Sequence, residues 1–178
     1  YDREISVPTL ANETTTMSRE RALAVLIEAS LKDEKDVRLA QDYQILLDSI
    51  RQDLDTRQYS EQHQVVFRDP HSLIQDGLSP LLDRQSSPER RQAALERIRK
   101  YAGLETGYQP ICKVFRARMQ SQMDKPGMLY PCASEVEMAL ARSGQIVRDI
   151  QGLLQDSHLH GWQEPFEQLK HQLADYDT

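Results

Sequence analysis

The sequence has little glycine and few aromatic residues: seven Gly, three Phe and one Trp occur among its 178 residues. Aromatic residues are enriched in β-strands, whereas Leu, Gln, Glu and Arg, which are abundant here, are good helix formers. The composition therefore favours helices over sheets.

A long apolar run and an excess of positive charge are also missing. No apolar run approaches the ~20 residues that cross a bilayer, so no membrane span is expected. The net charge of −6 and the isoelectric point near 5.4 argue against nonspecific nucleic-acid binding, which depends on surplus Lys and Arg. With 39% hydrophobic and 28% charged residues, the chain is too apolar to be disordered and suits one folded domain.

Cysteine is scarce too, because only Cys112 and Cys132 are present. Two cysteines are too few for a disulfide framework. Two free, partly buried thiols are therefore predicted, and a bridge would require their Cα atoms to lie within about 7 Å.

The clearest prediction is a helix that begins at Pro88 and ends near Ala102. Ser87 is placed to cap it, and proline suits the first helical position because its missing N–H has no partner there. Gly103 suits a left-handed residue just beyond the end. Apolar residues recur at helical spacing between these signals, so one side of the helix is expected to be buried.

Similar patterns predict helices along the rest of the chain, and Asp69-Pro70 repeats the combination of a capping residue and a proline at the first helical position. Residues 1–17 show no sustained period and are expected to form an extended lead-in to a helix capped by Ser18. Gly77 within a helical pattern indicates that something packs closely there, and Pro80 is expected to kink or split that helix. The apolar patterns of the other expected helices lie within residues 22–31, 39–54, 70–82, 111–123, 135–142, 146–154 and 165–176.

Two local details complete the prediction. Ser134 is placed to cap the helix over 135–142, which Ser143 and Gly144 are expected to interrupt. Residues 65–67 form the one strand-like fragment, and it is short. The expected fold class is all-α: an irregular bundle of about seven or eight amphipathic helices with short loops, in a single helical domain over 18–178 after the lead-in over 1–17.

The two ends carry little targeting information. The chain begins at Tyr1 with no signal-peptide pattern, and it stops at Thr178 directly after a helical pattern. We therefore expect both ends to be cut from a longer protein. The compartment stays open between cytoplasm and periplasm.

Histidines offer two candidate metal positions. His158 and His160 lie two residues apart, but no nearby Asp, Glu or Cys completes a ligand set at recognisable spacing. Glu167 and His171 share a helix face, yet the zinc pattern His-Glu-x-x-His is absent. A polar connector and an ordinary surface hydrogen-bonded pair are the predictions.

Basic residues surround the helix that begins at Pro88, and they are expected to form internal salt bridges with acidic helices rather than an anion site. They are Arg90, Arg91, Arg97, Arg99 and Lys100. The same expectation covers Arg116 and Arg118. No Ser lies in a Gly-x-Ser-x-Gly elbow and no Cys lies in a reactive motif, so the residues predict no catalytic, cofactor-binding or metal site.

Short segments in a fixed order resemble the N-terminal half of a bacterial domain-of-unknown-function family, number 885 (DUF885). They are PERRQAALERIRKYAGLE at 88–105, GYQP at 107–110, KPGML at 125–129, EVE at 135–137, GWQEP at 161–165 and LADYD at 173–177. Upstream, GLSPLLD at 77–83 is similar in placement.

This resemblance implies an all-helical, zincin-like metallopeptidase whose zinc motif lies in the C-terminal half. The present chain would then be the half without metal or other cofactor, inactive alone, with zinc only in the full-length protein. Its partners would be the missing C-terminal half and a peptide substrate. Exposed Tyr101, Tyr108 and Arg99 are the candidates for one wall of a substrate groove.

If part of the protein is missing, apolar surface is expected to lie open on the last helix around Phe166, Leu169 and Leu173. The alternative is a self-sufficient, non-catalytic helical scaffold or protein-interaction domain. The two hypotheses differ in whether a zinc-binding helix follows in the same gene.

Overall fold

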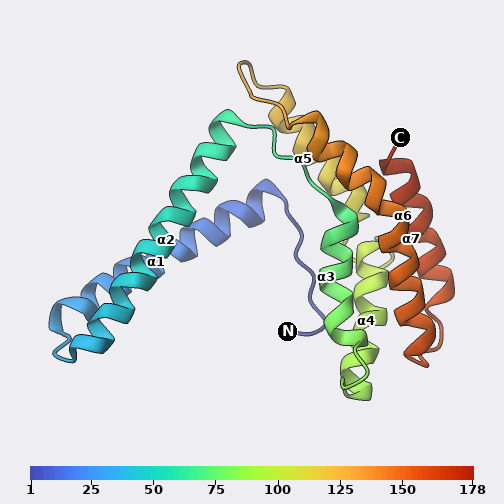
Figure 1. Ribbon diagram of the computed structural model, residues 1–178, viewed down its shortest axis with the longest axis horizontal. Coiled ribbons are helices and arrows are strands. Elements are labelled where there is room, and N and C mark those ends of the chain that lie inside the picture. The colour runs from blue at the N-terminus through green and yellow to red at the C-terminus, as the bar shows by residue number, and fades with distance from the viewer. The chain divides into compact units, whose positions relative to one another are not determined.

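The computed structural model describes residues 1–178, and every regular element in it is a helix (Figure 1). The expected all-α fold is therefore confirmed. The helices are α1 (Leu10–Asp33), α2 (Val37–His63), α3 (Pro70–Leu82), α4 (Pro88–Tyr101), α5 (Ile111–Met123), α6 (Ala133–Asp156) and α7 (Gln163–Tyr176). The strand-like fragment forms no strand, because Gln64 makes only an isolated parallel bridge with Leu129.

Contacts between residues group the chain into two compact units, whereas the sequence predicts a single domain over 18–178. Unit 1 comprises residues 1–7, 67–121 and 131–178, and unit 2 comprises residues 8–66 and 122–130. Each unit is therefore assembled from segments that are distant in the sequence. The first seven residues belong to unit 1, although the helix that follows them belongs to unit 2.

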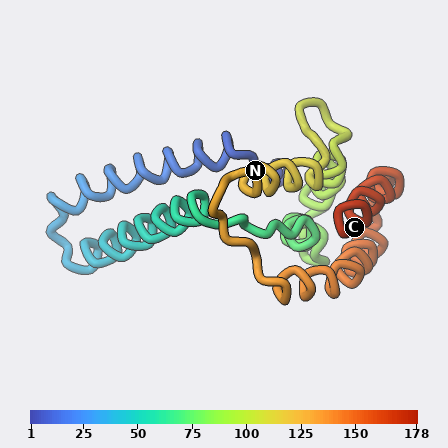
Figure 2. The backbone as a smooth tube through the Cα atoms, turned by 90° about the horizontal axis from the view of Figure 1, so that it is seen from above, coloured from blue at the N-terminus to red at the C-terminus, as the bar shows by residue number.

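Unit 2 is built on the hairpin of α1 and α2, which pack side by side (Figure 2). The buried and half-buried positions recur at alternating steps of three and four residues, as in a coiled coil. They include Met17, Glu20, Ala24, Ile27 and Leu31 on α1, and Ala40, Tyr43, Leu47, Ile50 and Leu54 on α2. The hairpin is thus an antiparallel coiled coil.

Ion pairs between α1 and α2 add to the apolar contacts of the coiled coil. Arg57 donates to both carboxylate oxygens of Glu20 at 3.0 Å, and Arg51 pairs with Glu28. The fully buried cluster is correspondingly small and consists of Ala24, Ile27 and Leu47. Several large apolar side chains of the hairpin stay exposed as a result, among them Leu23, Val25, Leu26, Ile45 and Leu46.

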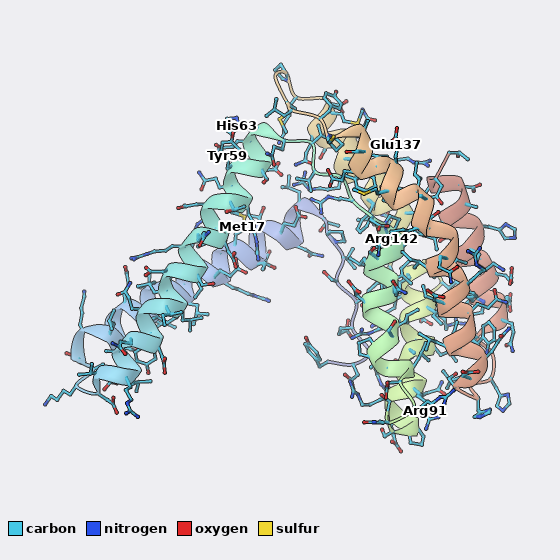
Figure 3. The ribbon with its side chains drawn as sticks, in the orientation of Figure 1. Met17, Tyr59, His63, Arg91, Glu137 and Arg142 are labelled. Carbon is cyan, nitrogen blue, oxygen red and sulfur yellow. The ribbon has the colours of Figure 1, made fainter.

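The segment 122–130 fixes the end of α2. Gln122 is fully buried; its Oε1 accepts from Val66 N at 3.1 Å and its Nε2 donates to Glu61 at 3.2 Å. Two backbone bonds of 2.8 Å add to this, from Val65 N to Leu129 O and from Leu129 N to His63 O. On α2 itself, the rings of Tyr59 and His63 lie 4.7 Å apart (Figure 3).

Unit 1 has the main hydrophobic core. In it α3 packs on α4 and α6, and α4 also packs on α7. The largest fully buried side chains of this core are Tyr101, Phe166, Ile74, Leu78, Ile98, Ile111, Ile150, Leu154, Leu169 and Leu173. One apolar stripe from each helix therefore faces the same interior.

Two of the predicted helix starts are confirmed by their caps. Asp69 Oδ1 accepts from the backbone N–H groups of His71 and Ser72, and Ser87 Oγ accepts from Arg90 N. Gly103 adopts φ +73° after α4, the left-handed conformation that the sequence predicts. These local signals work because the first N–H groups of a helix lack intrahelical partners.

Other predicted boundaries are wrong. Helix α1 begins at Leu10 and not at Ser18, so residues 10–17 are helical and the extended lead-in is shorter. Within α1 the hydroxyl groups of Thr14, Thr15 and Ser18 donate to carbonyl groups four residues earlier. Polar side chains are accommodated in this helix because they bond to its own backbone.

The C-terminal half shows two similar errors. Helix α6 begins after Cys132 rather than at a Ser134 cap, and it runs unbroken through Ser143 and Gly144. Ser143 is buried and donates to Leu140 O at 2.9 Å, so its hydroxyl does not compete with the helix. Helix α7 begins at Gln163, two residues before Pro165, which still lies in its first turn.

Gly77 lies in the close contact that the sequence predicts. A Cβ atom at this position would overlap the phenolic oxygen of Tyr101 and lie 3.2 Å from its Cζ. Tyr101 is itself 2% exposed. Pro80 does not split α3, which continues to Leu82.

Replacing Gly77 with Ala should therefore destabilise the protein by about 1–3 kcal/mol, because the buried Tyr101 must shift to make room. The matched control is Gly152→Ala in α6, where no heavy atom lies within 4 Å of the new Cβ. That change should stabilise by about 0.5–1 kcal/mol through helix propensity. Urea unfolding followed by circular dichroism measures both, and equal effects of the two variants would contradict the close contact.

Candidate functional site

A surface pocket of about 550 Å³ with mainly apolar walls lies between α5 and α7 of unit 1. Its wall includes Cys112, Lys113, Arg116, Gln172, Asp175 and Tyr176. Two cations and one carboxylate thus border a largely apolar hollow. Such a mixture suits an apolar ligand that carries a polar or anionic group.

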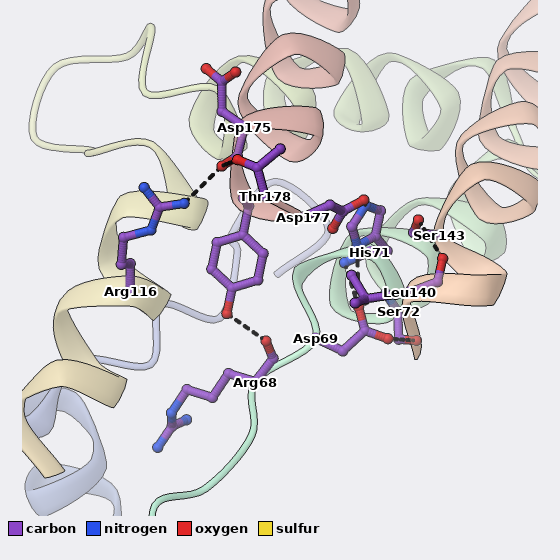
Figure 4. A network of polar contacts seen from close by, with 11 residues as sticks. Arg68, Asp69, His71, Ser72, Arg116, Leu140, Ser143, Asp175, Asp177 and Thr178 are labelled. Carbon is purple, nitrogen blue, oxygen red and sulfur yellow. Dashed lines mark hydrogen bonds and ion pairs between the residues drawn. The ribbon is translucent and has the colours of Figure 1, made fainter. Parts of the chain in front are cut away.

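Arg116 and Tyr176 form the fixed part of this wall (Figure 4). The guanidinium group of Arg116 donates to Asp175 O at 2.8 Å and lies 5.7 Å from the centre of the Tyr176 ring. The Tyr176 hydroxyl donates to Arg68 O at 2.8 Å. These contacts anchor the end of α7 to α5 and to the segment before α3.

Two of the titratable side chains that line the pocket, Cys112 and Tyr176, are neutral at pH 7. Burial raises the pKa of the Cys112 thiol to about 12 and the pKa of the Tyr176 hydroxyl to about 12. A thiol in this state is a poor nucleophile, because the thiolate is the reactive form. The Cys112 thiol is therefore a poor candidate for a nucleophile in this pocket.

A histidine between two carboxylates lies close to the same end of α7. His71 is 4% exposed; its Nδ1 lies 3.4 Å from Asp69 Oδ1, and its Nε2 lies 3.4 Å from Asp177 Oδ2 (Figure 4). Because both ring nitrogens face protein carboxylates, neither is directed at a substrate. The arrangement connects the N-terminus of α3 to the end of α7 and acts as a structural clasp.

Asp69 is the charged centre of this clasp. Partial burial works to raise its pKa, but hydrogen bonds from His71 and Ser72 outweigh burial and lower the pKa from 3.8 to about 2. The shortest of these bonds runs from Ser72 Oγ to Asp69 Oδ2 at 2.6 Å. Asp69 is thus ionised across the physiological range and stabilises the helix it caps.

The histidine candidates from the sequence do not assemble into a site. His158 and His160 are both exposed, and His158 has φ +57°. Glu167 pairs with Lys170 at 2.9 Å, so the predicted hydrogen bond between Glu167 and His171 is wrong. No group of three or more His, Cys, Asp or Glu side chains is placed to hold a metal ion.

Basic residues of α4 do form internal contacts, but their partners differ from those expected. Arg90 and Lys100 pair with Asp2 and Glu4 of the N-terminal segment, and Arg99 pairs with Glu105 in the next loop. None of these partners belongs to an acidic helix. Two other arginines donate to backbone carbonyls instead. Arg97 donates to Gly77 O, and Arg91 donates to Ser86 O and Ser157 O.

Arg116 and Arg118 were expected to behave in the same way. Arg116 contacts the Asp175 carbonyl, as described above, and Arg118 is 5% exposed and bonds to Ser121 Oγ at 3.3 Å. Backbone and hydroxyl oxygens thus satisfy several of these cations.

The predicted open surface is not found, and one of the three predicted groove residues is misplaced. Tyr101 is buried against α3 and cannot line an exposed groove, whereas Arg99 is exposed and Tyr108 is half-buried. Phe166, Leu169 and Leu173 are at most 1% exposed, because α7 packs them into the core of unit 1. The exposed apolar side chains lie elsewhere, mainly on the hairpin of unit 2.

Comparisons with known proteins add no relative. No family model, curated protein or solved structure matches the chain. None of its helices combines the length and the apolar character needed to cross a bilayer.

The lowered pKa of Asp69 predicts a specific pH dependence of stability. Its folded-state pKa lies below the unfolded value of 3.8, so the stabilisation is complete above about pH 4 and is lost as the pH falls towards 2. Allowing for solvent screening of a half-exposed group, the lost stabilisation should be about 1–2 kcal/mol. Urea unfolding of wild type and Asp69→Asn between pH 7 and pH 2 should give curves that converge at low pH.

Asp36→Asn is the matched control for this experiment, because Asp36 caps α2 with the same backbone bonds. A constant difference between wild type and Asp69→Asn across the whole pH range would contradict the role of the carboxylate charge.

The two cysteines should differ in reactivity. Cys112 is buried and its pKa is raised, whereas Cys132 is exposed and hydrogen bonding with Ser134 lowers its pKa. A thiol reagent should therefore titrate one thiol in the native protein and the second only after denaturation. Cys132→Ser should remove the native reaction and Cys112→Ser should leave it intact; rapid native labelling of Cys112 would refute the assignment.

Proposed function

We propose that this chain is the helical, non-metal part of a zincin-like peptidase that resembles the DUF885 family. Zinc would be bound by residues outside 1–178. The side chains described here do not fit a zinc site, since no three His, Cys, Asp or Glu side chains are placed to hold a metal ion together. No catalytic step is therefore assigned to them, and the proposed role of this chain is to bind and orient a peptide.

The ordered segments that resemble the family carry this proposal. Most of them fall in unit 1, where they supply α4, the start of α6 and both ends of α7. Residues within them form part of the core, including Ile98, Tyr101, Trp162 and Leu173. The resemblance thus rests on residues that determine the packing of unit 1, and the all-α fold agrees with what it implies.

Within unit 1, the pocket between α5 and α7 is the best candidate for peptide contact. Arg116 can offer a charge-assisted hydrogen bond at its rim, and Tyr176 and Ala117 supply apolar surface. Gln172, another lining residue, is held in place because its Nε2 donates to Ala102 O at 3.0 Å.

One observation favours the alternative of a helical interaction domain. The hairpin of unit 2 exposes large apolar side chains on both helices, and Leu26 and Ile45 are 65% and 69% exposed. Exposed apolar surface of this kind often marks a protein-binding face. A scaffold role would use this face and would need no hydrolytic activity.

The test compares the complete product of the gene with the 178-residue chain. We expect the complete product to hydrolyse unstructured peptides in a chelator-sensitive manner and the 178-residue chain to be inactive. In the complete product, Arg116→Ala should raise KM about tenfold, equivalent to one lost charge-assisted hydrogen bond. Arg142→Ala, at an exposed position of α6, is the matched control (Figure 3).

Two results would overturn this proposal. One is chelator-sensitive hydrolysis by the 178-residue chain, and the other is a complete product that hydrolyses no peptide. An inactive complete product that captures a partner through the hairpin would support the scaffold alternative.

A further inference from the structure

Residues 1–7, here called the arm, contact α4 mainly through their side chains. The arm begins with a turn, in which Glu4 N donates to Tyr1 O at 3.0 Å. Asp2 Oδ2 accepts from Arg90 Nε at 2.9 Å, and Glu4 Oε1 accepts from Lys100 Nζ at 3.1 Å. The arm and α4 both belong to unit 1. The side chains of residues 2, 3 and 4 of the arm are negative, positive and negative. Their partners on α4 carry the opposite charges in the same order.

The middle pair completes that alternation. Arg3 lies 3.4 Å from Glu96, between the two contacts just described. Because residues 2, 3 and 4 pair with residues 90, 96 and 100, the arm runs in the same direction as α4. Ile5 then packs against the core, so the pattern ends on an apolar anchor.

The carboxylate of Glu4 has the most complete set of partners. Besides Lys100, it accepts from Tyr108 Oη at 2.9 Å. Lys100 lies 4.9 Å from the centre of the Tyr108 ring and also donates to Arg3 O at 2.8 Å. Its side chain is only 13% exposed, so Lys100 is already oriented towards this position.

We propose that α4 and Tyr108 form a docking site for a short acidic peptide of a partner protein, and that the arm occupies this site as an internal ligand. The partner segment would carry acidic residues two positions apart, as Asp2 and Glu4 are, followed directly by an apolar residue. Arg90 and Lys100 would bind its carboxylates, and the site of Ile5 would bind its apolar side chain. This proposal does not depend on a peptidase function.

The tether of the arm decides which ligand can replace it. The arm belongs to the same chain as its site and therefore stays near it at a high effective concentration, so an identical arm from a second copy cannot compete at micromolar protein concentration. A successful competitor must bind better than the arm. It must also avoid placing a negative charge opposite Glu96, which pairs with Arg3 at 3.4 Å.

The proposal can be tested with full-length chain and a fluorescent peptide of the arm sequence, YDREISV. We expect weak binding to wild type and at least tenfold tighter binding to the double variant Asp2→Asn, Glu4→Gln, whose own arm is weakened. Adding Lys100→Ala to that variant should abolish binding, and higher salt should weaken it. Anisotropy titration measures the affinity, and circular dichroism verifies that each variant is folded.

The matched control is Asp53→Asn, Asp55→Asn, which removes two charges from exposed positions of α2 and should bind the peptide as weakly as wild type. Equal affinity for wild type and the arm variant, or unchanged binding after Lys100→Ala, would refute the site. So would a lack of binding to the arm variant. A wild-type dimer that dissociates in the arm variant would assign the site to a second copy and overturn the proposal of a separate partner.

Discussion

The packing of α3 against α4 is the constraint on which unit 1 depends. Without a side chain at Gly77, the ring of Tyr101 can lie directly on α3, and α6 and α7 close over the apolar faces that result. Both surfaces to which we assign a role are outer faces of this core. The arm lies on α4, and the pocket is bordered by α7, so both helices must be held firmly for either surface to exist.

Much of the fold is predictable from local signals, and the errors have local causes as well. Asp69 and Ser87 are correctly identified as caps because a cap involves only the next three residues. Ser18 is predicted to cap a helix and Ser143 to interrupt one, yet both hydroxyls donate to carbonyl groups of earlier residues within a continuing helix. Whether a serine caps a helix or bonds back to the backbone of a continuing helix depends on packing, and a short sequence window does not contain that information.

The candidate sites are predicted less well because they depend on contacts between distant residues. The sequence indicates that Tyr101 lies on an apolar stripe, but only the fold shows that this stripe is fully buried. The partners of Arg90 and Lys100 lie 88 and 96 residues away, so no spacing rule could find them. Cys112 carries no motif, and its burial beneath the pocket follows only from how α5 packs.

The arm contacts α4 but is far from it in the sequence, and this affects the order in which the two segments are synthesised. Ribosomes add about 5–20 residues per second, so the arm is synthesised roughly 5–20 s before the residues that bind it. The hairpin of α1 and α2 uses local contacts and can form during this interval. The nascent arm meanwhile has no place to bind, and a chaperone or another acidic-segment receptor can reach it before unit 1 is complete.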